Sequence, residues 1–266
     1  MPTVERNLES WNKGYDWVDQ GEEWSSTWGG SEAQWFGSIF PRVHAFLPTD
    51  TILELAPGFG RWTHYLRKYC AHLTIVDLAE TCINACRQRF SADAHITYHV
   101  NDGKSLAMIP DKSVDFVFSF DALVHAEADV LQAYLSQLAD KLKPNGVGFI
   151  HHSNLGAYQQ TFSASQRIPD RLRTPLINRG LLDQTHWRAF SMTARTFEQY
   201  CEQAGLQCIS QETVNWGTKR MIDCFSLFTP KDSTWARPNR AIANPHYMKE
   251  AELIRRLSSL YAVAHL

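Results

Sequence analysis

The stretch TILELAPGFGRWTHYLRKYC, residues 51–70, decides the fold. It begins with the apolar run 51–55, turns through Gly58 and Gly60, and continues with large apolar side chains at helical spacing, namely Trp62, Tyr65, Leu66 and Tyr69. This pattern predicts a strand, a tight turn and an amphipathic helix. The first turn of a helix has unpaired N–H groups, so we expect the turn to bind a phosphate or a carboxylate.

An acidic residue at the end of the next apolar run narrows the ligand class. The run 73–77 ends in Asp77, 19 residues after Gly58, where an acid in doubly wound folds accepts hydrogen bonds from ribose hydroxyls. Ala56 stands where a dinucleotide fingerprint has its first glycine, and Trp62 stands near the third. Ala56 is tolerated if its φ is negative. The turn therefore predicts nucleoside binding, with a tight turn and an exposed aspartate as the structural alternative.

Composition excludes several classes of partner. The 266 residues suffice for one large domain with appendages, and 26 basic against 28 acidic residues give a formal charge of -2. This balance offers no global attraction to nucleic acid or to an anionic membrane. We therefore expect the binding partner to be a small molecule or a glycan. No apolar run approaches the ~20 residues of a membrane span, and the N-terminus does not resemble a signal peptide. We expect a cytoplasmic protein, with its oligomeric state open and a homodimer among the options.

The cysteines support an intracellular location. Six are scattered along the chain without C-x-x-C spacing. Several occupy apolar positions of helical or strand patterns, so we interpret them as reduced core thiols.

Alternating strand and helix patterns extend well beyond the glycine turn. Apolar runs predict five further strands after the first two, at 96–100, 114–120, 147–153, 206–214 and 223–229. Amphipathic segments separate most of them, which is typical of an α/β, doubly wound and mostly parallel sheet, here with seven strands.

Composition also suggests how the chain is divided. Residues 1–50 hold five of the nine tryptophans and predict a helical, aromatic cover. Residues 51–230 form the main domain, with an arginine-rich insertion at 154–190, and residues 231–266 form a C-terminal extension with one helix.

Five motifs in order carry a family resemblance: ILELAPGFGRWT, LTIVDLAE, HVNDGKSL, VDFVFSFDALVH and LKPNGVGFI. Over about residues 51–153 the chain resembles the class I S-adenosylmethionine-dependent methyltransferases. The resemblance implies a Rossmann-like sheet with an antiparallel end strand. It also implies S-adenosylmethionine (SAM) as cofactor and S-adenosylhomocysteine (SAH) as product.

The resemblance implies a set of cofactor-binding residues. Glu54 would support the turn and the amino end of the methionine, while Gly58 and Gly60 lie against the cofactor. Asp77 would hold the ribose, and Asp102 would meet the adenine amino group. The remaining expected members lie beside these motif positions: Ala56, Leu78, Gly103 and Phe120.

Polar side chains follow the fourth and fifth strands, where the acceptor should enter. They are Asp121, His125, His151 and His152. An aliphatic hydroxyl must lose its proton as it attacks, and histidine suits that task at neutral pH. We expect His125 to be the general base, His152 or His151 the next candidate, and Asp121 an orienting hydrogen-bond partner. Alternation along a strand should send one of the paired histidines to each face.

Three further assignments stay open. Asp121, His125 and one of the paired histidines could instead hold a divalent ion, which we do not favour, and we assign no metal ligands. The arginines of the insertion could bind a phosphate or carboxylate of the acceptor or form a solvated surface. They are Arg167, Arg171, Arg173 and Arg179. The N-terminal tryptophans could close over the cofactor or serve as packing anchors.

The leading hypothesis is O-methylation of a hydroxyl on a sugar, a glycan or another small hydroxylated molecule. The methyl group would move by in-line displacement with a histidine base. The alternatives are N- or O-methylation of a natural product and a SAM-binding protein without catalysis. A hydride-transfer enzyme is a lesser alternative.

Overall fold

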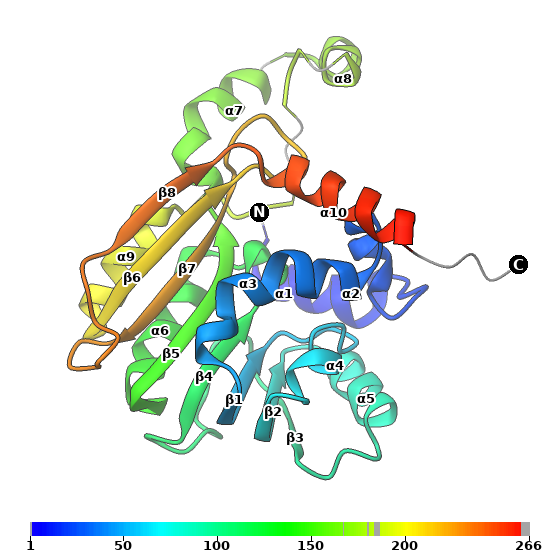
Figure 1. The fold of residues 1–266 in the computed structure, drawn as a ribbon. Helices are drawn as coiled ribbons and strands as arrows, with labels where there is room; N and C mark the ends of the chain where they lie inside the picture. The colour runs from blue at the N-terminus through cyan, green and yellow to red at the C-terminus, as the bar shows by residue number, and fades with distance from the viewer. Residues whose placement is uncertain (1, 167, 180, 184–186, 262–266) are drawn as a thin grey trace, which may run out of the picture.

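The computed structural model describes residues 2–166, 168–179, 181–183 and 187–261. One eight-stranded sheet runs through the molecule with helices on both of its faces (Figure 1). The strand order is β3-β2-β1-β4-β5-β7-β6-β8. The order reverses between β1 and β4, and ligands of doubly wound sheets bind at that point beyond the carboxyl ends of the strands.

Five strands are parallel, and the sheet changes direction after them. The parallel strands are β1 (Thr49–Leu55), β2 (Cys70–Asp77), β3 (Ile96–Val100), β4 (Val114–Ser119) and β5 (Leu142–Ser153). β7 (Asp223–Pro230) lies antiparallel between β5 and β6 (Leu206–Val214). The expected Rossmann-like, mostly parallel sheet with an antiparallel strand is confirmed.

The sheet has eight strands where the sequence predicts seven. β8 (Arg240–Asn244) pairs in parallel with β6, with Ile242 opposite Glu212. Four of its five residues are exposed, so the segment has no buried apolar alternation that would identify it as a strand.

One face of the sheet is covered by α4 (Thr63–Leu66), α5 (Glu80–Arg89) and the N-terminal segment. That segment contains α1 (Val4–Glu9), α2 (Ser31–Gln34) and α3 (Phe40–Val43), linked by short 3₁₀ and π helices and, between α1 and α2, an irregular stretch. Trp28 and Trp35 are buried in this layer. The helix after the glycine turn is shorter than predicted, because the chain enters β2 already at Cys70.

The C-terminal helix α10 (Tyr247–Tyr261) runs along the N-terminal helices, as Figure 1 shows in red and blue. The ring of Tyr247 packs against Trp28 with centroids 5.9 Å apart, and Ala251 is fully buried. α2 and the last helix of the described chain therefore share one layer.

The other face carries α6 (Ala128–Lys141) and α9 (Ala194–Gln203). The side-chain oxygen of Thr193 accepts a hydrogen bond from the Thr196 amide at 2.9 Å, and Gly205 follows the helix with φ of +78°. The predicted cap and end of this helix are confirmed. The insertion forms α7 (Gln159–Gln166) and α8 (Asp170–Asn178), which stand at one end of the molecule in Figure 1.

Candidate active site

A pocket lies where β1, β2 and β4 end, beneath the N-terminal segment. Eight of the residues that the sequence predicts for the site line it: Ala56, Gly58, Asp77, Leu78, Gly103, Phe120, Asp121 and His125. Its lining combines aromatic rings with a few polar groups, as is usual for small-molecule sites.

The glycine turn is left-handed at three positions. Ala56, Gly58 and Gly60 have φ of +55°, +58° and +85°. The expectation of a negative φ at Ala56 is wrong, and a non-glycine residue in this region costs about 1–2 kcal/mol. A side chain at Gly58 would meet Trp17 at 2.8 Å, so only glycine fits there. Gly60 lies outside the pocket lining, because it packs against Phe90 of the α5 layer, where a Cβ would sit at 2.5 Å.

Asp77 joins the turn to the pocket. Its carboxylate accepts from the Ala79 amide at 2.9 Å and from the Gly58 amide at 3.2 Å. Burial raises the pKa of Asp77 to about 6, although these amides act in the opposite direction. Two accepted bonds leave lone pairs free, so the carboxylate suits the hydroxyls of a ribose.

Glu54 lies buried behind the same turn. It accepts a hydrogen bond from the Thr63 hydroxyl at 2.6 Å, which holds the first residue of α4. Burial raises the pKa of Glu54 to about 8. Its other oxygen, Oε1, is buried and meets no donor among the described residues. This acceptor fits one further donor, such as the amino group of the SAM methionine, although Glu54 does not line the pocket.

Asp102 lies outside the pocket lining, whereas its neighbour Gly103 belongs to it. The Asp102 carboxylate accepts from the amides of Lys104 and Ser105 at 2.9 and 2.6 Å. These bonds hold its pKa below the usual value. The side chain therefore closes its own turn, and the structure does not place it on the expected adenine contact.

His125 brings a neutral ring to the pocket. Its Nδ1 bonds the carbonyl oxygen of Trp187. Because a carbonyl only accepts, Nδ1 carries the proton and Nε2 keeps its lone pair. The rings of Trp187 and Trp11 lie 4.9 and 5.5 Å away. Burial, and then the charge of Arg188, lowers the pKa of His125 to about 4.

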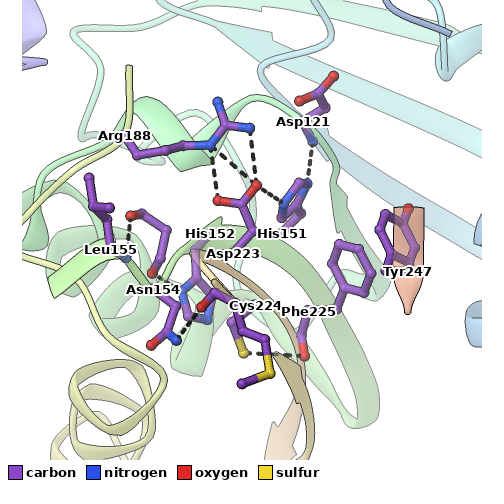
Figure 2. Close-up of polar contacts among 12 residues, drawn as sticks. Asp121, His151, His152, Asn154, Leu155, Arg188, Asp223, Cys224, Phe225 and Tyr247 are labelled. Atoms are coloured by element: carbon purple, nitrogen blue, oxygen red, sulfur yellow. Dashed lines mark hydrogen bonds and ion pairs between the residues drawn. The ribbon is translucent and has the colours of Figure 1, made fainter. Parts of the chain in front are cut away.

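The paired histidines of β5 lie on opposite faces, as predicted. His152 stacks on Phe197 at 4.3 Å, and its Nε2 bonds the Ser226 hydroxyl at 2.8 Å. It is fully buried and does not line the pocket, so the expectation of a catalytic His152 is wrong. His151 lies beneath the pocket floor, against Phe120 at 4.8 Å. Its Nδ1 accepts from the Asp121 amide at 3.1 Å (Figure 2).

Arg61 is a pocket residue that sequence reasoning missed. Its guanidinium pairs with the Asp121 carboxylate at 2.9 Å and bonds the Ser25 hydroxyl at 3.1 Å. It also lies over the ring of Trp62, 4.5 Å from its centroid. A cation directly after the glycine turn was the available signal.

The N-terminal segment closes one side of the pocket with tryptophans. Trp11, Trp17 and Trp24 line it, and Trp17 stacks on Phe59 at 4.4 Å. The side chain of Asn7 donates to the carbonyl of His125 at 2.7 Å. Trp28 and Trp35 are core anchors instead, so the packing interpretation holds for these two, and closure over the cofactor stays a prediction for the three that line the pocket.

Other expected features do not meet at the pocket. Within the described ranges, no three His, Cys, Asp or Glu side chains gather as a metal site. Arg171 and Arg179 are exposed, neither they nor Arg173 line the pocket, and Arg167 lies outside the described residues.

The helices that the structure describes include none with the length and apolar character to cross a bilayer.

A family model described as a methyltransferase domain matches residues 52–146. This match supports the resemblance of residues 51–153 to the class I S-adenosylmethionine-dependent methyltransferases. A solved structure of the same fold is the N-methyltransferase NodS from Bradyrhizobium japonicum in complex with SAH. This chain is 14% identical to NodS, over 85% of this chain and 95% of NodS, with a TM-score of 0.53. At that identity the comparison shows the fold alone.

Two curated relatives match this chain at higher identity over a shorter stretch. Phosphoethanolamine N-methyltransferase 1 of Triticum aestivum is 28% identical over 165 residues, which cover 59% of this chain and 32% of the relative. Phosphoethanolamine N-methyltransferase of Plasmodium falciparum is 26% identical over 96 residues, 36% of each chain. The chain thus spans about a third of the length of either relative.

Proposed function

We propose that the protein transfers the methyl group of SAM to a nitrogen of a small amine. The observation that carries the proposal is the unprotonated Nε2 of His125 at a pocket that is also lined by the Asp121 carboxylate and four indole rings. SAM, when bound, supplies a methyl group on a sulfonium that an acceptor can attack in line.

The chain's own residues would bind and orient the reactants. Asp77 would accept hydrogen bonds from the ribose hydroxyls, and Glu54 Oε1 would accept one from the methionine amino group. His125 would take the proton that the acceptor loses, at Nε2. The Asp121 carboxylate would orient the acceptor, and the N-terminal tryptophans would exclude water.

Two features favour an amine acceptor. Indole faces attract cationic nitrogen groups, and a carboxylate at the same pocket adds to that attraction. The two curated relatives above are N-methyltransferases, so phosphoethanolamine is the first amine to test.

Methylation of a hydroxyl, on a sugar or a similar molecule, is the second candidate. The observation that favours it is again the free Nε2 of His125, because an aliphatic hydroxyl needs a neutral base within reach as it attacks. Sugars and amines should therefore be compared as acceptors in one assay.

The test is a methyl-transfer assay with labelled SAM and a matched acceptor panel. Ethanolamine, phosphoethanolamine and their mono- and dimethyl forms are compared with simple sugars and sugar phosphates. Label in amines with loss of activity in His125→Gln supports the proposal, and label only in sugars supports the second candidate. SAM binding with no transfer to any acceptor would contradict both and favour a binding protein.

We also propose that the protein acts in a reducing compartment such as the cytoplasm. Its six cysteines are all free thiols, and five of them are buried.

A further inference from the structure

A chain of charged and polar groups runs under the pocket floor, and Figure 2 shows most of it. Arg188 holds the Asp223 carboxylate with its Nε at 2.9 Å and its Nη2 at 3.0 Å. Oδ2 of that carboxylate, which Arg188 Nη2 contacts, also lies 3.3 Å from Nε2 of His151. Asp223 and His151 are fully buried. The chain continues through Asp121 to Arg61.

The hydrogen bond between Asp121 and His151 fixes the ring's protonation. A backbone N–H can only donate, so the Nδ1 that faces it is unprotonated. The proton of a neutral His151 therefore sits on Nε2, which lies 3.3 Å from Asp223 Oδ2 without the alignment of a hydrogen bond. The nearby negative charge of Asp223, which Arg188 compensates, favours this form of His151, and this form can accept from Asp121.

The accepted bond acts on a strained position. Asp121 has φ of +59°, a conformation that costs a non-glycine residue about 1–2 kcal/mol. Such a conformation persists where its surroundings hold it, and the His151 bond is one such restraint on the Asp121 amide. In this conformation the Asp121 carboxylate pairs with Arg61 and lines the pocket.

We propose that His151 is a positioning residue that holds Asp121 in its left-handed conformation and so presents the Asp121 carboxylate to the acceptor. The inference rests on the proposed function for the identity of the acceptor. Asp223 and Arg188 extend it, because they hold the His151 ring and its tautomer in place. His151 touches neither reactant.

The test compares three variants of adjacent residues. His151→Leu removes the acceptor for the Asp121 amide, whereas His151→Asn keeps one, because the Asn side-chain oxygen can take the place of Nδ1. His152→Leu is the matched control, since His152 is equally buried on the same strand but faces the other side of the sheet. Thermal unfolding of all three is measured alongside the kinetics.

We expect His151→Leu to raise the KM of the acceptor about tenfold with a smaller change in kcat, since a misplaced orienting group costs binding and alignment. His151→Asn should recover most of the KM, and His152→Leu should leave it unchanged. Loss of kcat alone in His151→Leu, or an equal KM change in His152→Leu, would contradict the positioning role.

A second readout needs no turnover. In ¹⁵N spectra of the wild-type protein, His151 should carry its proton on Nε2, and the Asp121 amide signal should shift in His151→Leu but stay near its place in His151→Asn. The opposite tautomer, or an Asp121 signal indifferent to both changes, overturns the inference. A wild-type protein that methylates nothing would instead refute the proposed function, while these spectra would still decide the inference.

Discussion

Asp77 combines two tasks in one side chain. Its carboxylate holds the glycine turn through the Gly58 amide, and it lines the pocket, where we propose that it binds the ribose. Hydrogen bonds to a charged acceptor contribute about 1.5–3 kcal/mol each. We therefore expect Asp77→Asn to weaken SAM binding about 10- to 100-fold in titration calorimetry.

The matched control is Asp102→Asn, because the Asp102 carboxylate is used by its own turn. We expect only a few-fold change there. An equal loss of affinity in Asp102→Asn would restore the adenine contact that the family resemblance implies.

The raised pKa of Asp77 makes SAM binding depend on pH. Ribose hydroxyls bind the carboxylate form, and that form is lost as the pH falls through about 6. Affinity should fall between pH 7 and pH 5 in the wild type and stay nearly flat in Asp77→Asn. A flat wild-type profile would show that Asp77 does not titrate there.

His125 should set the acid limit of the rate at a lower pH than an ordinary histidine. The base must be unprotonated, and its pKa lies at about 4 instead of 6.5. With SAM and acceptor saturating, kcat should hold down to about pH 5 and fall below it. His125→Gln should reduce kcat by about 10²- to 10⁴-fold. A fall centred near pH 6.5 that disappears in His125→Gln would contradict the lowered pKa.

At the scale of elements, the glycine turn shows which features local sequence patterns can predict. The strand, the turn and Asp77 follow from residues close in sequence, so they could be predicted. The role of His152 could not, since it depends on which groups from other segments reach its ring. The Asp102 carboxylate binds amides only two and three residues away, a local turn that the motif-based expectation of an adenine contact overlooked. Ser226 of β7 occupies the His152 ring nitrogen, and nothing near His152 in sequence indicates it.

Gly58→Ala tests the contact between the turn and the N-terminal cover. Alanine would adopt φ of +58° at a cost of about 1–2 kcal/mol and would also displace Trp17. Gly205→Ala is the control, because Gly205 has a similar φ of +78° but open space around it. We expect both variants to lose unfolding free energy in urea.

Only Gly58→Ala should also weaken SAM binding, because only there does the new methyl group disturb the pocket. Adding Trp17→Leu should relieve part of this effect. Equal SAM affinities in the two glycine variants would show that the Trp17 contact is unimportant.

At the scale of the whole molecule, the buried pair of Arg188 and Asp223 ties the insertion to the sheet. Asp223→Asn leaves a buried guanidinium without its counterion, which typically costs about 3–5 kcal/mol of unfolding free energy. Asp129→Asn, which breaks the exposed pair with Lys104, should cost less than about 1 kcal/mol. Urea unfolding at pH 7 distinguishes the two.

The same pair predicts a pH dependence of stability. Burial acts to raise the pKa of Asp223, but Arg188 and His151 outweigh it and hold the pKa well below its usual value. A carboxyl with a lowered pKa stabilises the fold above its unfolded pKa of about 4, and this contribution is lost as the pH falls further. The difference between wild type and Asp223→Asn should therefore shrink below about pH 4. A difference that is constant down to pH 2 would contradict this explanation.

Whether an N-terminal tryptophan lies in the core or at the pocket also depends on the whole molecule. The sequence shows that residues 1–50 are rich in tryptophan, but the burial of each indole depends on the segments that pack against it. Trp28 is buried because Tyr247 of α10 packs against it, and Trp17 meets the pocket because Phe59 supports it. Neither partner could be identified from spacing along the chain.

The shared layer of N-terminal helices and α10 has a consequence for synthesis on the ribosome. The tryptophans that close the pocket are made among the first residues, whereas Tyr247 and Ala251, which back that layer, leave the ribosome much later. Until then the N-terminal segment lacks the packing of α10 against it, and its indoles stay exposed to solvent and to chaperones. A nascent chain that stops before α10 should accordingly bind SAM poorly, although every residue that lines the pocket has already been translated.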